Sequence, residues 1–432
     1  MQIENRKIIT LLAIVTILLI SMTACGGNSG TNEPTPPQNQ NTGSNTGQTN
    51  TPTQPTATPT EPEQTGEWMI PLNATGRAIE RNIIAAGGEH SLAVMENGTL
   101  MAWGLNESYQ LGDGTTNNTN IPLAVMDNVV SVYAGYTHSM AITSDGVLWV
   151  MGNTGGTMGV DRGPTVYNTP TRFMESVVAA SAGTNHSMAI RADSSLWAWG
   201  DNFSGRLGDG TTERQLNPVR IMENVVSVAA GPSHTFAITE DGGLWSWGRN
   251  LNGVLGDGTE EDRHSPVRIL ENITTVATGH SFGLALDNEG NMWAWGSVGN
   301  GGFGGSAWHV TTTPEIVAEG IIAMDAHTAN VASVVNAFAI NQSNQLIRWQ
   351  NGDIRFVSFD GSRRSSNQHY FENVIDVSAG LTHALAMTHD GELWVWGSDE
   401  HGKLGTGLIN DTHPAGFERS SPTLIMNGLM LP

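Results

Sequence analysis

The sequence predicts an all-β fold, a seven-bladed β-propeller built from repeats of about 48 residues. Two series of glycines and one series of histidines recur at this spacing. The members are Gly87, Gly135, Gly183, Gly231 and Gly279; Gly104, Gly152, Gly200, Gly248 and Gly296; and His90, His138, His186 and His234. Such strict spacing indicates one supersecondary unit copied end to end, in which each copy covers the apolar face of its neighbour.

Residues 225–266 show most clearly how one copy folds. The β-branched run at residues 225–231 predicts a buried first strand, and residues 235–239 predict a second. The Asp-Gly pair at 241–242 marks a tight hairpin, because glycine accepts the positive φ of such turns, and residues 244–248 form a third strand. A Gly-rich connector completes the copy. Four short strands in about 48 residues are the size of one propeller blade.

Seven copies can be counted from two recurring elements. The Ala-Gly or Thr-Gly element occurs at Gly87, Gly135, Gly183, Gly231, Gly279 and Gly380, with a degraded version at residues 325–327. The Trp-Gly element of the third strand lies near Trp103, Met151, Trp199, Trp247, Trp295, Trp349 and Trp396. The sixth copy is eroded, since residues 346–350 lack the glycine and residues 354–369 are extra sequence. The count predicts seven blades.

The two ends of the repeat array are expected to meet. The C-terminal residues 421–431 resemble residues 217–227, so the chain ends on the start of a further unit. Residues 82–87 begin with a matching strand. A ring closed in this way has no exposed sheet edge at its ends to invite aggregation.

The motifs resemble a known family. Ala182-Gly-Thr-Asn-His-Ser187, Asp145-Gly-Val-Leu-Trp149, Trp199-Gly-Asp-Asn202 and Leu207-Gly-Asp-Gly210 are similar to the signature of regulator of chromosome condensation (RCC1-type) repeats. The resemblance covers residues 81–425. It implies a seven-bladed propeller, in agreement with the count above, and the family name implies guanine-nucleotide exchange on a small GTPase.

The N-terminal region is predicted to be an export and anchoring segment. Arg6-Lys7 precedes a 13-residue apolar run at residues 8–20, which suits a signal peptide, and residues 22–25 resemble a bacterial lipoprotein signal that ends at Cys25. We expect residues 1–24 to be removed and Cys25 to be lipidated; an uncleaved anchor helix or a plain secretory signal are the alternatives. Residues 25–68, rich in Thr, Pro, Asn and Gly, predict a disordered linker, and residues 69–432 the propeller. The protein is then extracytoplasmic and lipid-anchored to the bacterial cell membrane.

Charge narrows the possible partners. The net charge is −22, and Lys403 is the only lysine after Lys7. Nucleic acid binding draws on basic patches, so no nucleic acid partner is expected. An anionic membrane surface repels such a domain, which leaves the lipid as the only membrane contact. Cys25 is the only cysteine, so internal disulfides are excluded.

The residue types that suggest chemistry are expected to build the repeat. His90, His138, His186, His234 and His383 occupy equivalent positions at strand starts, where an imidazole can satisfy backbone groups. Paired tryptophans such as Trp245 and Trp247 fall in third strands and predict packing between blades, whereas Trp308 lies outside this register. Asp113, Asp209 and Asp257 in Gly-Asp-Gly-Thr segments predict β-turns, not calcium loops. No catalytic residue, metal site or cofactor is predicted.

Loops at one end of the propeller are the expected binding site. The Gly-to-His and Trp-Gly-x-Asn loops follow strands one and three, so both open on one end, while the Asp-Gly hairpins and the Gly-Thr-to-Pro connectors are expected at the other. The first end carries variable residues in a constant frame, typical of binding surfaces. Tyr109, Tyr136 and Phe203 are the candidate anchors. Tyr167, Trp308 and the acidic run at 260–262 are assigned to the other end.

Three functions are considered. The first is a non-catalytic, surface-anchored propeller, a monomer, that binds an unknown protein or cell-envelope component through one face. The second is the guanine-nucleotide exchange activity implied by the family name, although export separates the domain from cytosolic GTPases. The third is a propeller enzyme acting on polysaccharide, which requires acids clustered on one face.

Overall fold

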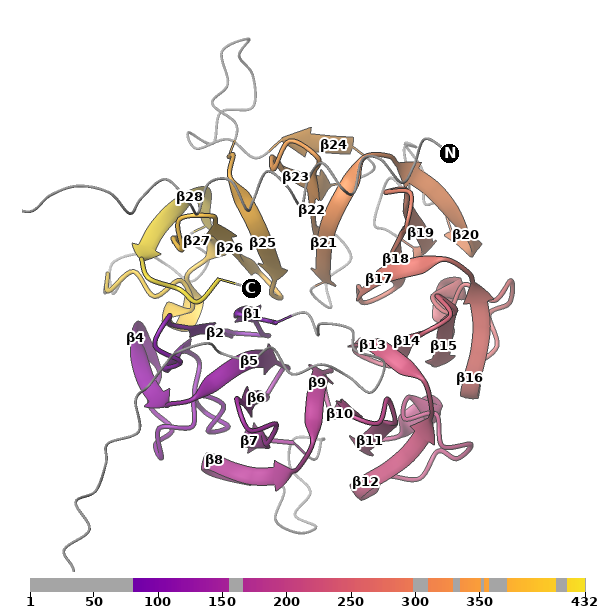
Figure 1. The fold of residues 1–432 in the computed structure, drawn as a ribbon, viewed down its shortest axis with the longest axis horizontal. Helices are drawn as coiled ribbons and strands as arrows, with labels where there is room; N and C mark the ends of the chain where they lie inside the picture. Colours follow the sequence, from indigo (N-terminus) through magenta and orange to yellow (C-terminus); the bar gives the residue numbers. More distant parts are fainter. Residues whose placement is uncertain are drawn as a thin grey trace, which may run out of the picture. The chain divides into compact units, whose positions relative to one another are not determined.

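A computed structural model describes residues 81–154, 166–297, 310–328, 335–350, 353–356, 371–408 and 418–431. These residues form seven antiparallel four-stranded sheets, arranged around a centre as the blades of a propeller (Figure 1). The predicted all-β, seven-bladed fold is therefore confirmed. The predicted signal peptide, the linker and Cys25 lie outside the described residues, as does Trp308.

Each blade is a meander of four consecutive strands. The first four blades contain β1 (Ile84–Ala86), β2 (His90–Val94), β3 (Leu100–Gly104) and β4 (Thr119–Met126); β5 (Val129–Ala134), β6 (His138–Thr143), β7 (Leu148–Asn153) and β8 (Val166–Met174); β9 (Val177–Ala182), β10 (His186–Arg191), β11 (Leu196–Gly200) and β12 (Gln215–Met222); and β13 (Val225–Ala230), β14 (His234–Thr239), β15 (Leu244–Gly248) and β16 (Arg263–Leu270).

The last three blades follow the same order. They contain β17 (Ile273–Thr278), β18 (Phe282–Asp287), β19 (Met292–Ser297) and β20 (Val310–Ala318); β21 (Ile321–Thr328), β22 (Val335–Asn341), β23 (Leu346–Gln350) and β24 (Asp353–Phe356); and β25 (Val374–Ala379), β26 (His383–Thr388), β27 (Leu393–Ser398) and β28 (Glu418–Met426). Three short 3-10 helices, η1 (Phe203–Gly205), η2 (Leu251–Gly253) and η3 (Glu400–Gly402), lie between third and fourth strands.

Burial changes from the second strand to the outer strand of a blade. The second strands are almost wholly buried, as in β6 and β14, because both of their faces pack against neighbouring blades. The fourth strands lie at the rim (Figure 1) and are half exposed. Six of them carry a proline at the equivalent position: Pro122, Pro170, Pro218, Pro266, Pro314 and Pro422. Proline cannot donate a ladder hydrogen bond, so it protects an edge strand from pairing with another chain.

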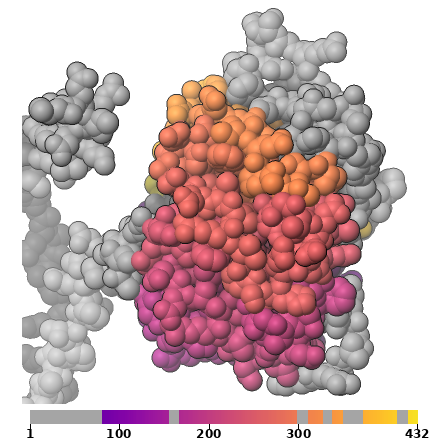
Figure 2. All heavy atoms as spheres, turned by 90° about the vertical axis from the view of Figure 1, so that its right-hand side faces the viewer, coloured from indigo at the N-terminus to yellow at the C-terminus, as the bar shows by residue number. Residues whose placement is uncertain are grey.

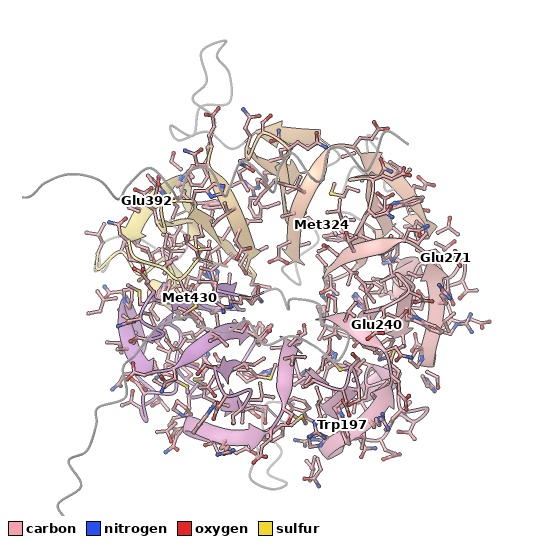
Figure 3. The ribbon with its side chains drawn as sticks, in the orientation of Figure 1. Trp197, Glu240, Glu271, Met324, Glu392 and Met430 are labelled. Carbon is pink, nitrogen blue, oxygen red and sulfur yellow. The ribbon has the colours of Figure 1, made fainter. Side chains whose placement is uncertain are left out.

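The ring closes with residues from both ends of the described propeller. The backbone N–H of Glu96 donates to Gly428 O at 2.8 Å, and the N–H of Met430 donates to Val94 O at 3.0 Å. Leu429 forms an antiparallel bridge with Met95. Met95 directly follows β2, so the C-terminal residues extend the pairing that Ile84–Ala86 make with β2. Figure 3 labels Met430 at the junction of the first and last blades. The prediction that the two ends meet and close the ring is confirmed.

The sixth blade corrects one detail of the sequence prediction. Residues 354–369 were expected to be extra sequence, but Asp353–Phe356 form β24, the fourth strand of this blade. Gln350 pairs with Asp353, so only two residues separate the third and fourth strands of this blade, where the other blades have a long connection. The remaining residues up to 370 lie outside the described part of the chain.

Strand directions assign the loops to two ends, here named the loop face and the hairpin face. The loop face carries the connections from first to second and from third to fourth strands, and the hairpin face carries the other connections. The Gly-Thr connectors were expected on the hairpin face; this is wrong, because they precede the fourth strand and so belong to the loop face. Tyr167 and Asp262 also belong to the loop face. Tyr167 pairs with Gly152, and Arg263, which follows Asp262, pairs with Gly248; both glycines lie at the loop-face ends of β7 and β15.

Candidate binding face

The repeated histidines connect neighbouring blades below the loop face. His90 Nε2 lies 2.8 Å from the Ser139 hydroxyl of the next blade, which donates its own proton to Gln110 O at 2.7 Å. The Ser139 oxygen therefore accepts from His90, and the imidazole proton is on Nε2. The partner predicted for these histidines was the backbone; the structure shows a side-chain hydroxyl instead.

The same contact recurs around the ring. Nε2 of His138 meets Ser187 at 2.9 Å, that of His186 meets Thr235 at 3.0 Å, and that of His383 meets Ser91 at 2.9 Å. His234 differs, because the equivalent position in the next blade is Gly283, and neither of its buried ring nitrogens has a hydrogen-bond partner within the described part of the chain. A Cβ at Gly283 would lie 2.3 Å from the ring of Trp295, so no hydroxyl can be placed there without movement.

Burial keeps these imidazoles neutral. Desolvation lowers the pKa of His90 to about 3, with a smaller effect from His138, and desolvation lowers the pKa of His138 to about 4. It also lowers the pKa of His234 to about 3. Neutral rings enclosed between blades act in packing, in agreement with the structural role predicted for them.

The tryptophans of the third strands also hold blades together. In blades 4 and 5 the second tryptophan of the pair is buried, and its indole N–H reaches the loop of the preceding blade: Trp247 Nε1 donates to Arg206 O at 3.0 Å and Trp295 Nε1 to Val254 O at 2.7 Å. Trp199 is buried in the same way, but its Nε1 has no hydrogen-bond partner among the described residues. A Cβ at Gly208 would lie 2.6 Å from Trp247, which explains the glycine after leucine in this motif. The packing role predicted for these tryptophans is confirmed.

The Gly-Asp-Gly-Thr segments form turns that use their own carboxylates. Asp209 Oδ1 accepts from the Thr211 N–H at 2.9 Å and from Asn202 Nδ2 at 2.9 Å. Asp113 and Asp257 make the same contacts with their own threonine and asparagine. The prediction of Asp-Gly turns is confirmed.

One group of possible metal ligands lies where the ring closes. Among the described residues, Glu89, Glu400 and His401 place ligand atoms within 4.8 Å of one another. The ammonium of the buried Lys403 contacts the Glu89 carboxylate and lies 2.6 Å from Thr382 Oγ1. The Lys403 ammonium already neutralises Glu89 and disfavours a second cation. We therefore interpret the group as an ion pair of Lys403 with Glu89 that connects the last blade to the first.

Exposed apolar side chains mark the loop face of blades 3 and 4. Phe203 and Leu251 occupy equivalent positions, the first residues of η1 and η2, and are 64% and 52% exposed. The turns that carry them are tightly held: a Cβ on Gly205 would lie 2.6 Å from His264 Cα, and one on Gly253 2.7 Å from Thr312. The face is asymmetric, because the equivalent residues of blades 1 and 7 are glutamates.

The three predicted anchors lie on the same face but in different settings. Phe203 is largely exposed, whereas Tyr109 and Tyr136 are half-buried. Tyr109 has a φ of 63° at the position where η1, η2 and η3 have glycine. Tyr136 packs over Gly88 of the first blade, where a Cβ would lie 2.7 Å from its ring. Leu251 is a variable loop residue that is not among the three predicted anchors, yet it is more exposed than Tyr109 or Tyr136.

Arg206 and Lys403 are enclosed on this face, whereas Arg249 is exposed. Arg206 is buried, donates from Nη1 to Pro232 O at 3.0 Å and lies 3.4 Å from the Asp201 carboxylate. Lys403 is enclosed in the same way in the last blade. Arg249, by contrast, is exposed, and within the described ranges no carboxylate lies within ion-pair distance of it.

A shallow depression lies beside these residues, at the centre of the loop face. It holds about 30 Å³ and is lined by the first-strand ends and following loops of blades 2 to 5, including Tyr136, Thr184, Pro232 and Thr278. Small side chains and glycines form most of the wall. Seen from the side, the middle blades lie directly against one another (Figure 2).

No helix among the described residues has the length and apolar character needed to cross a membrane. The apolar run at residues 8–20 is not part of that statement, because it lies outside the described residues.

Comparison with known proteins identifies the repeat. Two family models described as the regulator of chromosome condensation (RCC1) repeat match the chain. One matches residues 97–142, 193–238 and 241–286, and the other matches residues 83–110, 129–156, 177–206, 225–254 and 374–403. The matches cover parts of blades 1 to 5 and of blade 7, and they omit the eroded sixth blade.

Solved structures share the fold. The crystal structure of human WBSCR16 aligns with a TM-score of 0.62 and 18% identity, over 76% of this chain and 94% of that one. Yeast RCC1 (Prp20), solved bound to Kap60, aligns with a TM-score of 0.50 and 22% identity, over 80% of this chain and 74% of that one. Identities this low show the fold alone.

Proposed function

The chain belongs to the family of RCC1-repeat proteins, and on that basis we propose that it is a non-catalytic binding module whose partner protein docks on the loop face of blades 3 and 4. A propeller of this family supplies a rigid frame, and its variable loops supply the contacts. The proposal commits to a protein partner because Phe203 and Leu251, which are exposed on this part of the face, are aromatic and aliphatic.

The observation that carries the proposal is the pair Phe203 and Leu251. Large apolar side chains at equivalent positions of adjacent blades, each more than half exposed, present a contact surface that a partner can cover. Because η1 and η2 are packed against the next blade, little entropy is lost when they bind. Aromatic anchors on such rigid turns are common centres of binding energy.

We further propose that the propeller is held outside the cytoplasm by lipid on Cys25. The support is the sequence: the Arg6-Lys7 pair, the apolar run that follows, and a lone cysteine at the end of a lipoprotein-like signal. Partners are then proteins of the cell envelope or the exterior.

The two competing functions lack a comparable observation. Yeast RCC1 (Prp20) was solved with Kap60, but a likeness at 22% identity does not transfer a partner to this chain. A polysaccharide enzyme needs carboxylates free to act on a substrate, and Asp113, Asp209 and Asp257 of the loop face are engaged in turns. We therefore put forward binding alone.

Site-specific photo-cross-linking tests the proposed function. A benzophenone side chain is placed at position 203, at position 251, or at the exposed Ser144 on the hairpin face, each in the full-length protein expressed in its own envelope. We expect a discrete adduct at 203 and 251 that is missing at 144, and its partner to be identified by mass spectrometry. Adducts only from position 144, or none from any position, would contradict the proposal.

A further inference from the structure

Arg249 is an exposed cation in a strongly acidic chain, and among the described residues no carboxylate lies within ion-pair distance of it. It follows Gly248 at the end of β15, and its backbone N–H donates to Ser233 O at 2.9 Å, which fixes the start of the side chain at the loop face. The chain carries a net charge of −22. Among the described residues Arg191 and Arg214 form no ion pair either, but both are half-buried, whereas Arg249 is exposed and its charge is open to a partner.

Three aspartates in the loops of blades 3 and 4 already make contacts of their own. Asp201, which holds the equivalent position in blade 3, lies 3.4 Å from Arg206. In blade 4, Asp257 lies 2.6 Å from Arg263 Nε, and Asp262 accepts from the Asn250 N–H at 2.8 Å. These three aspartates serve their own loops, and no carboxylate of the described residues lies within ion-pair distance of Arg249.

The surroundings of Arg249 favour a carboxylate placed next to an apolar group. Leu251 is two residues along the chain, and Arg206, whose Nε donates to Phe203 O at 3.1 Å, packs with its Cα 3.2 Å from a Cβ built on Gly248. Arg206 thus connects the turn that carries Phe203 to Gly248, which directly precedes Arg249 and lies three residues before Leu251. His280 of the next blade is half-buried beside Arg249, whose charge adds to burial in lowering the pKa of His280.

We propose that the partner segment presents a carboxylate to Arg249 and an adjacent apolar side chain to Phe203 and Leu251. The guanidinium binds a carboxylate through two parallel hydrogen bonds, which selects this group over a neutral amide. The chain as a whole, with its net charge of −22, repels acidic segments, and Arg249 provides a local positive charge that offsets this repulsion. This inference rests on the proposed function and names the chemistry of its partner.

Random displayed peptides are the probe. Peptides are selected on the full-length protein, and those whose binding is lost in a Phe203→Ser, Leu251→Ser double variant are kept. Each kept peptide that carries Asp or Glu is synthesised with that residue and with its amide counterpart. We expect acidic residues to be enriched beside Phe, Leu or Trp, and the amide to bind wild type about tenfold or more weakly.

Arginine variants decide whether Arg249 is the receiver. With Arg249→Gln the acid and amide peptides should bind equally, and Arg249→Lys should restore part of the difference. Arg220→Gln is the matched control, because Arg220 is an exposed arginine of β12 that is paired with Glu223 at 3.1 Å, and it should leave the tenfold preference intact.

The outcomes separate the two proposals. Peptides that depend on Phe203 and Leu251 but show no acidic preference, or an acid preference that Arg249→Gln leaves unchanged, overturn this inference and leave the proposed function standing. If no selected peptide depends on Phe203 and Leu251, the proposed function fails and this inference fails with it.

Discussion

The Ser91 hydroxyl lies 2.9 Å from His383 Nε2 and so joins the first blade to the last by the same contact that joins internal neighbours. The hydroxyl also donates to Lys403 O at 2.8 Å, and Trp103 Nε1 donates to the same oxygen at 2.9 Å. The closing seam thus repeats the His–hydroxyl–carbonyl arrangement found between His186 and Thr235. The packing of the last blade against the first therefore uses the interface that the repeat makes elsewhere in the ring, and the C-terminal residues 428–430 add backbone pairing to the first blade.

Leu429 should be essential for closure. Leu429→Asp buries a carboxylate where the side chain is 3% exposed, and we expect a loss of several kcal/mol in the free energy of unfolding. Leu431→Asp is the control, because Leu431 is 51% exposed and should change the stability by less than about 0.5 kcal/mol. Denaturant titration of both variants provides the measurement, and equal losses would contradict the closure described above.

The two histidine environments predict opposite tolerance to phenylalanine. His186→Phe removes the bond to Thr235 and should cost about 1–3 kcal/mol. His234→Phe removes an imidazole that makes no hydrogen bond to the described residues and packs edge-on against Phe236, and blade 5 already has Phe282 at this position, so the change should be close to neutral. Thermal melting of the two variants compares them directly. A larger loss for His234→Phe would show that His234 has a role that the structure does not reveal.

Stability should fall as the pH decreases below about 6.5. The pKa values of His90, His138 and His234 are lowered by burial to about 3, 4 and 3, so the unfolded chain binds protons first as the pH falls through the usual histidine range. The stability that the neutral histidines contribute is fully present above the pKa of an unfolded histidine, and it is lost as the pH falls towards the lowered pKa values of the folded state. Melting temperatures measured from pH 8 to pH 4 should therefore decline, and a flat profile would be inconsistent with neutral buried rings.

Asp325 acts in the opposite sense over the same range. Burial raises the pKa of its carboxyl to about 6, even though its backbone bonds to Ala379 and Ala326 favour the charged form. The folded state therefore takes up this proton before the unfolded chain does, which adds stability as the pH falls through 6. In the Asp325→Asn variant that gain is missing, so the decline with acid should be steeper than in wild type.

Cys25→Ala should release the protein from the membrane fraction or leave it unprocessed. Acyl chains on Cys25 would supply the membrane affinity, at about 0.8 kcal/mol per buried methylene. Fractionation and gel mobility of wild type and variant, with metabolic labelling by a fatty acid analogue, provide the measurement. A variant that labels, migrates and fractionates like wild type would refute lipidation at this residue.

The repeat made the fold and the packing residues predictable. Glycine, histidine and tryptophan recur at fixed spacing because each blade meets the next through the same contacts, as Gly208 against Trp247 shows. The blade count and the turn role of Asp209 followed directly. The fourth strand of the sixth blade did not, because β24 lacks the proline and the glycine-rich loop that mark this strand elsewhere.

The sequence by itself determined the number of blades, the closure of the ring and the residues of the blade interface, because these depend on a pattern that each copy repeats. The tertiary structure alone decided which loop residues a partner can reach. Arg206 and Arg249 are both loop arginines, but the next blade buries Arg206 against Pro232 while Arg249 extends into solvent. Exposure of a loop side chain depends on the neighbouring blade, and that neighbour is close in space but about 48 residues away in the chain.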